Sequence, residues 1–344
     1  MRCPRLDELP PPPPGRTGWP WTEASPDLPE RQGDGRPWPR ISVVTPSYNQ
    51  AAFLEETIRS VLLQGYPDLE YVVIDGGSRD GSVEIIEKYS PWLAYWTSEP
   101  DRGQSHAINK GFQRTTGEIL AWLNSDDIYY PGALGTAAGA MTATRCDILI
   151  GAMDKVEASA SGQTVRFVRR CSPREGRRLH TFPVLARRPQ ADFHLIQPPM
   201  FWRRALWERT GGLDERYHHV MDLEWCSRAL ACGATVATID DVLARFLLHP
   251  GSKTHDLHDR HLEERVRMYL RLGRTPGFRP LPCLLAALEP ARRVLARRAH
   301  RHLAEGRMLT GFLLRTASFA IRGLDHAAAL LRSDQHGHPL AHRS

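Results

Sequence analysis

The sequence predicts an α/β fold in which a mostly parallel sheet is flanked by helices. Three apolar strand patterns, starting at Ile41, Tyr71 and Ile119, each run directly into polar and acidic residues. Apolar residues at helical spacing follow the first strand (AAFLEETIRSVLLQ) and the second (SVEIIEKY). Because the carboxyl ends of parallel strands meet at one edge of a sheet, we expect these polar residues to gather where open α/β sheets bind nucleotides.

The first two units repeat the order of strand, turn and helix. The strand ISVV is β-branched and apolar, and Pro46 and Asn49 mark the turn after it. The strand YVVI is followed by Asp75 and by a GGS segment that allows a tight loop. Asp80 and Ser82 then stand where helix caps are expected.

The third strand, ILAWL, ends in Asn124, Ser125, Asp126 and Asp127. The sequence has neither a GxGxxG nor a GxxxxGK[ST] loop after a strand, so a phosphate group must be held in another way. A divalent cation on Asp126 is the simplest arrangement that achieves this.

Seven motifs occur in a fixed order: TPSYNQ, IDGGSRDGS, DRGQSHAINKGF, TTGEILAWLNSDD, QPPMFWR, GGLDE and MDLEW. Together they resemble the inverting glycosyltransferases of family 2, with their GT-A fold, over roughly residues 41–254. The resemblance implies transfer of a sugar from a nucleotide-diphosphate donor to a hydroxyl of a glycan or lipid-linked acceptor. It also implies a bacterial setting of polysaccharide or lipopolysaccharide assembly in the cell envelope.

The resemblance assigns a metal, Mg²⁺ or Mn²⁺, to the last acid of a DxD-like pattern, which is Asp126. The first acid of that pattern is replaced by Asn124, whose amide can bond a ribose or a metal-bound water. Asp127 either assists the metal or caps the turn. His249, in the segment ARFLLHPGSKT, is implied as a third metal ligand or a phosphate contact, and the alternative is a structural histidine.

Further donor-binding residues follow from the same resemblance. Thr45, Pro46 and Tyr48 correspond to the wall of the base pocket. Asp75 corresponds to the acid that bonds the base or ribose, although it can equally cap the GGS turn.

The segment from Asp101 to Gly111 is implied to lie beside the diphosphate and the donor sugar. Its cations and amides suit an anionic, hydroxyl-rich ligand, with Arg102 and Asn109 as the favoured contacts and Lys110 as a weaker one. The alternative is a solvated helix start.

The catalytic base is implied at Asp222, the first acid of MDLEW. Met221 precedes it where many relatives have an acid, and this apolar neighbour predicts a raised pKa for Asp222. On the acceptor side we expect Gln197, Trp202 and Glu224. Two of them have structural alternatives: Trp202 can belong to the core, and Glu224 can cap the helix or pair with an arginine four residues later.

Composition indicates one main domain with two appendages. The chain has 344 residues, of which 41% are hydrophobic. We expect a proline-rich, extended and mobile arm over residues 1–38, a GT-A domain over 39–256 and a basic, amphipathic helical extension over 257–344. Trp19, Trp21 and Trp38 can attach the arm to the domain or to a partner.

Charge is distributed unevenly along the chain. Residues 257–344 contain 16 Arg and 7 Asp plus Glu, a net +9, so the formal charge of +6 leaves −3 for the first 256 residues. This asymmetry argues against a basic catalytic domain that binds nucleic acid. The leucine-rich, arginine-rich extension can instead contact an anionic membrane surface or pack on the catalytic domain.

Six cysteines without a CxxC motif favour a reduced, cytoplasmic setting. We expect no signal segment and no membrane span, so any membrane contact would be peripheral and on the inner face of the cell membrane. The alternative function is a non-catalytic nucleotide-sugar-binding or scaffold protein of a polysaccharide assembly complex. It is kept open by the departures at Asn124 and Met221.

Overall fold

The computed structural model describes residues 1–158, 164–169, 197–253, 259–275, 280–308, 310, 313–318 and 321. The chain divides into two compact units. Unit 1 comprises Met1–His180 and His194–His255, and unit 2 comprises Thr181–Phe193 and Asp256–Ser344.

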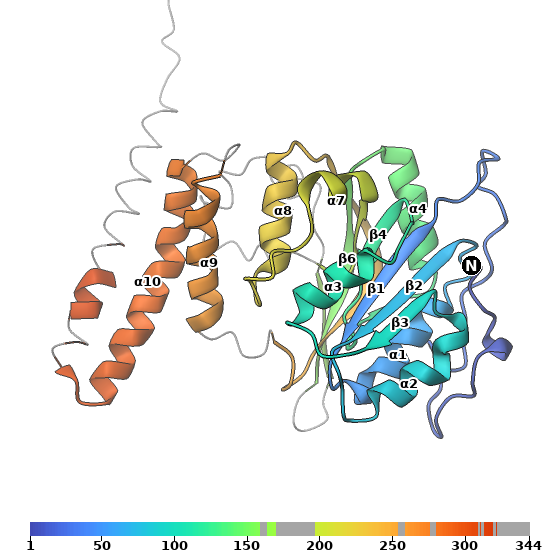
Figure 1. The fold of residues 1–344 in the computed structure, drawn as a ribbon, viewed down its shortest axis with the longest axis horizontal. Helices are drawn as coiled ribbons and strands as arrows, with labels where there is room; N and C mark the ends of the chain where they lie inside the picture. Colours follow the sequence, from blue (N-terminus) through green and yellow to red (C-terminus); the bar gives the residue numbers. More distant parts are fainter. Residues whose placement is uncertain are drawn as a thin grey trace, which may run out of the picture. The chain divides into compact units, whose positions relative to one another are not determined.

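A single sheet organises unit 1. Within the described residues its strands follow the order β3-β2-β1-β4-β8-β6-β9-β5, and β7 pairs with β6. Figure 1 shows β3, β2, β1 and β4 side by side. The strands are β1 Ile41–Ser47, β2 Leu69–Asp75, β3 Tyr95–Ser98, β4 Ile119–Trp122, β5 Ile128–Tyr129, β6 Ile148–Ala158, β7 Thr164–Arg169, β8 Met200–Arg203 and β9 Val236–Leu248. The block from β3 to β4 is parallel, as predicted, whereas β8 joins β4 and β6 antiparallel.

Helices cover the sheet (Figure 1). They are α1 Ala51–Leu62, α2 Ser82–Tyr89, α3 Gln104–Phe112, α4 Ala133–Thr144, α7 Arg204–Thr210 and α8 Met221–Ala231, with short 3-10 turns at Leu6–Glu8 and Ser90–Trp92. The helices α1 and α2 lie where the apolar spacing predicts them, so the α/β class inferred from the sequence is confirmed.

Alternation along β1 places neighbouring side chains on opposite faces of the sheet. Val43 belongs to a core with α1, α2 and α4, to which Leu54 and Leu134 contribute. Val44 faces α3, where a Cβ added to Gly111 would lie 2.4 Å from its Cγ1. Glycine at position 111 therefore lets α3 pack directly on the parallel strands.

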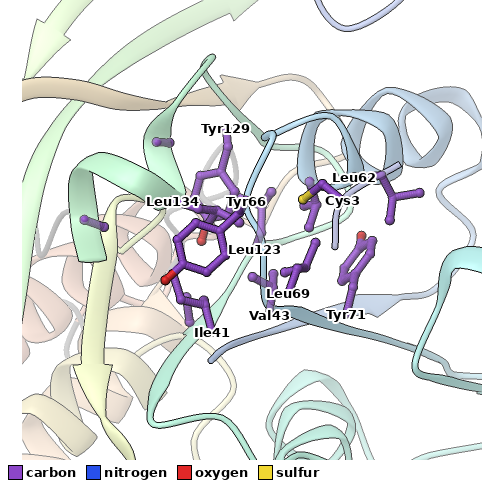
Figure 2. Close-up of a cluster of buried hydrophobic side chains, with 14 of the residues drawn as sticks. Cys3, Ile41, Val43, Leu62, Tyr66, Leu69, Tyr71, Leu123, Tyr129 and Leu134 are labelled. Carbon is purple, nitrogen blue, oxygen red and sulfur yellow. The ribbon is translucent and has the colours of Figure 1, made fainter. Parts of the chain in front are cut away.

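The N-terminal segment differs from the mobile arm that its composition predicts, because it is packed on unit 1. Cys3 is 2% exposed and Trp21 is 6% exposed. Figure 2 shows Cys3 within the same apolar cluster as Leu62 and Tyr71. The proline-rich segment cannot bury a core of its own, but its apolar side chains complete the core of the domain.

Arg59 of α1 fixes this segment in place. Its side chain is fully buried, and it donates to the backbone carbonyls of Pro10, Pro20 and Trp21 at 2.8–3.0 Å. Trp19 also donates from Nε1 to a carbonyl of β5 at 2.8 Å. The tryptophans therefore attach the segment to the domain, one of the two alternatives that the sequence left open.

Unit 2 contains α9, Asp259–Leu272, and α10, Pro280–Ala304, which pack against each other. Their shared interior includes Met268 and Tyr269, both fully buried, and Ala299, 2% exposed. In the residues that the structure describes, every helix is too short or too polar to cross a membrane.

Candidate active site

The topology brings the predicted polar residues to one edge of the sheet. Ser47, Asp75 and Ser98 end three neighbouring parallel strands in register. β4 lies beside β1 and leads into the Asn124–Asp127 turn. Because β8 runs antiparallel to β4, the chain that enters β8 at Gln197 arrives at the same edge.

The Asp75 carboxylate is hydrogen-bonded to the turn that follows β2. Its carboxylate accepts hydrogen bonds from the Gly77 N–H at 3.0 Å, from the N–H and hydroxyl of Ser78 at 2.8 and 2.5 Å, and from the Ser98 hydroxyl at 2.7 Å. The carboxylate is fully buried. The geometry therefore favours the turn-capping alternative over direct contact with a nucleotide.

Of the three residues expected to line a base pocket, only Tyr48 is exposed to solvent. Its exposed fraction is 63%, whereas Thr45 is fully buried with its hydroxyl 3.0 Å from that of Tyr71, and Pro46 is also buried. Thr45 and Pro46 therefore support the loop from beneath and do not contact solvent.

Asp126 and His249 face each other where the loop after β4 meets the end of β9. The distance from Asp126 Oδ2 to His249 Nε2 is 3.1 Å. The Gly251 N–H donates to His249 Nδ1 at 3.2 Å, which assigns the ring proton to Nε2, facing the carboxylate. Phe53 of α1 packs against the imidazole at a centroid distance of 4.4 Å.

Asp127 turns away from this pair. It is fully buried, its Oδ1 accepts the Leu247 N–H at 3.0 Å, and its Oδ2 accepts from Asn124 at 3.2 Å. Burial, followed by the neighbouring charge of Asp126, raises the pKa of Asp127 well above its usual range. Its placement thus favours the turn-holding alternative.

Across the described residues, no three His, Cys, Asp or Glu side chains form a ready metal cluster. The pair of Asp126 and His249 nevertheless fits two ligands of one ion. Two oxygen or nitrogen atoms at adjacent octahedral positions around a small cation lie about 3 Å apart, given bonds of about 2.1 Å. The observed distance of 3.1 Å between the two donor atoms agrees with this spacing.

Asn124 lies in a chain of side-chain amides. Its Oδ1 accepts from Gln104 at 2.7 Å, and its Nδ2 donates to Gln197 at 3.3 Å. Gln104 in turn accepts from the Lys253 ammonium at 2.7 Å. Gln104 and Lys253 were not selected from the sequence, although Lys253 stands four residues after His249 in the same polar segment.

Arg102 and Asn109 differ in what they can offer a ligand. Arg102 is exposed and pairs with Glu215 at 2.7 Å. Asn109 both donates to and accepts from the backbone of Leu213, at 2.9 and 2.8 Å. Asn109 therefore holds the loop between α7 and α8 and is not directed at a donor, and Lys110 pairs with Glu99.

Asp222 occupies the first turn of α8. Burial raises the pKa of Asp222 to about 6, in the direction expected from its apolar neighbour. Its Oδ1 accepts the Leu223 N–H at 2.7 Å. The Ser105 hydroxyl of α3 contacts the Met221 sulfur at 2.9 Å, so the first turn of α3, which also carries Gln104, is linked to the start of α8.

Two residues expected to contact an acceptor have structural roles. Both oxygens of Glu224 accept from Arg228, at 2.8 and 2.9 Å, and Glu224 is only 5% exposed. Trp202 is fully buried, with its ring centroid 5.0 Å from those of Trp122 and Trp225. A sugar platform requires an accessible ring face, and Trp202 has none.

Comparison with known proteins identifies the domain. Residues 42–208 match the family model described as glycosyl transferase family 2. This match covers just under half of the chain and indicates a glycosyltransferase family 2 domain, whose sheet and helices have the GT-A fold. An uncharacterized glycosyltransferase of Mycobacterium tuberculosis is 42% identical over 90 residues, which cover 26% of this chain and 34% of that protein. The match thus spans about a third of the curated relative's length.

Two solved structures are similar to this chain over most of its length. TarS 1-349 of S. aureus, in complex with UDP-GlcNAc, has a TM-score of 0.54 and 18% identity over 77% of this chain and 73% of that one. The mannosyltransferase PcManGT from Pyrobaculum calidifontis, in complex with GDP-Man and Mn²⁺, has a TM-score of 0.53 and 22% identity over 89% and 87% of the two chains. At these identities the likeness concerns the fold alone.

Proposed function

We propose that this chain is an inverting, metal-dependent glycosyltransferase that moves a sugar from a nucleotide-diphosphate donor to a hydroxyl of a glycan or lipid-linked acceptor. The observation that carries the proposal is the pairing of Asp126 with His249 at 3.1 Å, at the edge where the parallel strands end. The match to the family 2 model supports it. A role in polysaccharide or lipopolysaccharide assembly rests on family analogy.

Asp126 and His249 are the residues that would hold Mg²⁺ or Mn²⁺. When bound, such an ion offsets the negative charge that grows on the leaving diphosphate. Ligation by His249 Nε2 requires its proton to move to Nδ1, so the hydrogen bond from the Gly251 N–H would break. The exposed Tyr48 ring is suited to stack on a base, and the exposed Arg102 guanidinium is suited to the diphosphate.

Asp222 is proposed as the general base that accepts the proton of the attacking hydroxyl. A base works best when its pKa lies near the operating pH, and burial has moved the pKa of Asp222 to about 6. The carboxylate is therefore ionised at neutral pH while it remains more basic than an ordinary aspartate.

Thermal unfolding with a panel of UDP, GDP, dTDP and CMP sugars, with and without Mn²⁺, tests donor binding. A ligand that binds only the folded protein raises Tm. We expect one nucleotide class to raise Tm in the presence of Mn²⁺, and we expect Asp126→Ala to abolish that increase. The absence of any increase across the panel would contradict the proposal.

We also propose that unit 2 contacts an anionic membrane surface, which would place the enzyme peripherally on the inner face of the cell membrane. A hollow of about 470 Å³ between the start of α9 and the end of α10 supports this. It is lined by Arg260, Glu263, Arg298, Arg301, His302, Glu305 and Arg307. Leu270, Met308 and Leu313 are exposed by 41–68% in the same unit, and basic surfaces with exposed apolar residues suit a lipid interface.

A further inference from the structure

Three side chains from different segments form a directed chain of hydrogen bonds beside Asp126. The Lys253 ammonium donates to Gln104 Oε1 at 2.7 Å. Gln104 Nε2 then donates to Asn124 Oδ1 at 2.7 Å. This hydrogen-bond chain joins the loop after β9, the first residue of α3 and the turn after β4.

The chain continues from Asn124 into the interior. Its Nδ2 donates to Asp127 Oδ2 at 3.2 Å and to Gln197 Oε1 at 3.3 Å. Gln197 Nε2 donates in turn to the Trp122 carbonyl at 2.8 Å. Each amide therefore accepts through its oxygen and donates through its nitrogen.

The two ends of this hydrogen-bond chain, the Lys253 ammonium and the Trp122 carbonyl, fix which atom donates at each step. An ammonium can only donate, so Gln104 must present its oxygen to Lys253 and its nitrogen to Asn124. A backbone carbonyl can only accept, so at the other end Gln197 must present its nitrogen to Trp122 and its oxygen to Asn124. Asn124, between the two glutamines, must therefore accept from Gln104 and donate to Gln197.

An aspartate at position 124, which the DxD pattern would supply, cannot fill this link. Its carboxylate would still accept from Gln104, but it has no N–H to donate to the oxygens of Asp127 and Gln197. Two buried acceptors would then lose their donor, and two carboxylates would meet. The departure from the family pattern therefore matches the requirements of the surrounding side chains.

Through Lys253, the hydrogen-bond chain also restrains the loop of residues 249–253. His249 contacts Asp126 at 3.1 Å, and Lys253, four residues later, is held by Gln104. We propose that Asn124 is a positioning residue, whose amide orients Gln104 so that Lys253 and its loop are held beside Asp126 before a donor binds. Given the proposed function, the ammonium so positioned would contact the anionic diphosphate of the nucleotide sugar.

Hydrogen exchange without any nucleotide tests the positioning itself. The amides of Gly251 and Ser252, which bond within the loop, report its opening. We expect Asn124→Asp to speed their exchange about tenfold, because repulsion from Asp127 displaces the carboxylate at 124 from Gln104. Gln113→Glu, the same amide-to-acid change at an exposed position at the end of α3, should leave their exchange unchanged. Exchange in Asn124→Asp equal to that of the unmodified protein would overturn the proposal.

A double variant that swaps the residues at positions 124 and 127 separates positioning from a general effect of added charge. In Asn124→Asp/Asp127→Asn, the amide at position 127 can donate to the carboxylate at 124 and can still accept the Leu247 N–H. The number of carboxylates is unchanged. We expect most of the loop protection to return, and exchange as fast as in Asn124→Asp alone would contradict the directed chain.

The functional consequence is measured separately, as Mn²⁺-dependent binding of UDP and GDP. Lys253→Met and Asn124→Asp should each weaken binding of the preferred nucleotide about tenfold, and the double variant should lose no more than either alone. Losses that multiply to about a hundredfold would overturn the coupling. If neither nucleotide binds the unmodified protein and no donor of the panel raises its Tm, the proposed function fails, whereas the exchange result still decides the positioning role.

Discussion

Asp222 is the proposed general base, and its burial determines how it titrates. Because the proposed base acts only when ionised, kcat/KM should fall as the pH drops through about 6. Asp222→Asn should lose about 10²–10⁴-fold in transfer rate, the usual contribution of a general base. A pH–rate profile without an acid limb near this value would contradict the assignment.

The same residue should affect stability in the opposite sense. The pKa of Asp222 is raised from 3.8 to about 6 on folding, so the folded state favours the protonated form. Its contribution to stability is therefore fully present below about pH 4 and is lost as the pH rises through about 6. We expect Asp222→Asn to be more stable than the unmodified protein at pH 8, by roughly 1–3 kcal/mol, and this difference should vanish near pH 3.5. Chemical denaturation at both pH values measures it.

At the level of elements, hydrogen bonds from α3 and from α8 hold the loop between α7 and α8. Asn109 of α3 pairs with the backbone of Leu213, and Arg228 of α8 donates to the Gly212 carbonyl at 2.7 Å. Arg228 is itself held by the buried Glu224. These contacts fix the approach of the chain to Asp222.

Asn109→Ala distinguishes this structural role from a donor contact. It removes both hydrogen bonds to Leu213, so we expect the free energy of unfolding to fall by about 1–3 kcal/mol. Binding of the preferred nucleotide diphosphate with Mn²⁺ should be unchanged at temperatures well below unfolding. A large loss of nucleotide affinity with unchanged stability would instead restore the donor contact inferred from the sequence.

The sequence predicted the elements better than it predicted the partners of individual side chains. The α/β class and the edge that gathers Asp75, Asn124 and Asp126 follow from strands that end in polar residues. The roles of Trp202 and Asn109 depend on contacts with residues about 80 to 104 positions away, at Trp122 and Leu213. Such long-range contacts leave no periodic pattern in the sequence. The motifs QPPMFWR and DRGQSHAINKGF therefore could not, by themselves, separate ligand contacts from structural ones.

At the level of the whole molecule, the N-terminal segment is part of the domain. Arg59 is fully buried and its guanidinium satisfies carbonyls of a proline-rich chain that has no ladder of its own. On α1, the Thr57 hydroxyl lies 2.9 and 2.7 Å from the carbonyls of Ser125 and Asp127. One helix therefore connects the segment to the turn that carries Asp126.

Deleting residues 1–38 should destabilise unit 1, because the buried Arg59 loses its three carbonyl acceptors and keeps only the Tyr89 hydroxyl. We expect Arg59→Met in the full chain to lower Tm by several degrees. Arg36→Met removes an exposed arginine paired with Asp34 in the same segment and should change Tm little. Equal Tm values for the unmodified chain and the deletion would mean that the segment does not contribute to the fold.

The proposed membrane contact of unit 2 predicts binding that depends on lipid charge. We expect the protein to bind phosphatidylglycerol vesicles at low salt and not phosphatidylcholine vesicles. Arg260→Gln combined with Arg307→Gln, both in the lining of the hollow, should weaken binding about 25-fold, given about 1 kcal/mol per basic residue. Arg79→Gln, in unit 1, is the matched control. Equal binding to both kinds of vesicle would exclude an electrostatic contact.

Metal-dependent sugar transfer based on Asp126 and Asp222 is measured as the release of nucleoside diphosphate from UDP, GDP and dTDP sugars. The assay compares the unmodified protein with Asp126→Ala and Asp222→Asn, in Mn²⁺ and in EDTA. We predict release only by the unmodified protein in Mn²⁺, with the donor still bound by Asp222→Asn and lost by Asp126→Ala. Release by Asp222→Asn at the unmodified rate, or no release from any donor, would contradict the account, and donor binding without release would favour a non-catalytic nucleotide-sugar-binding protein.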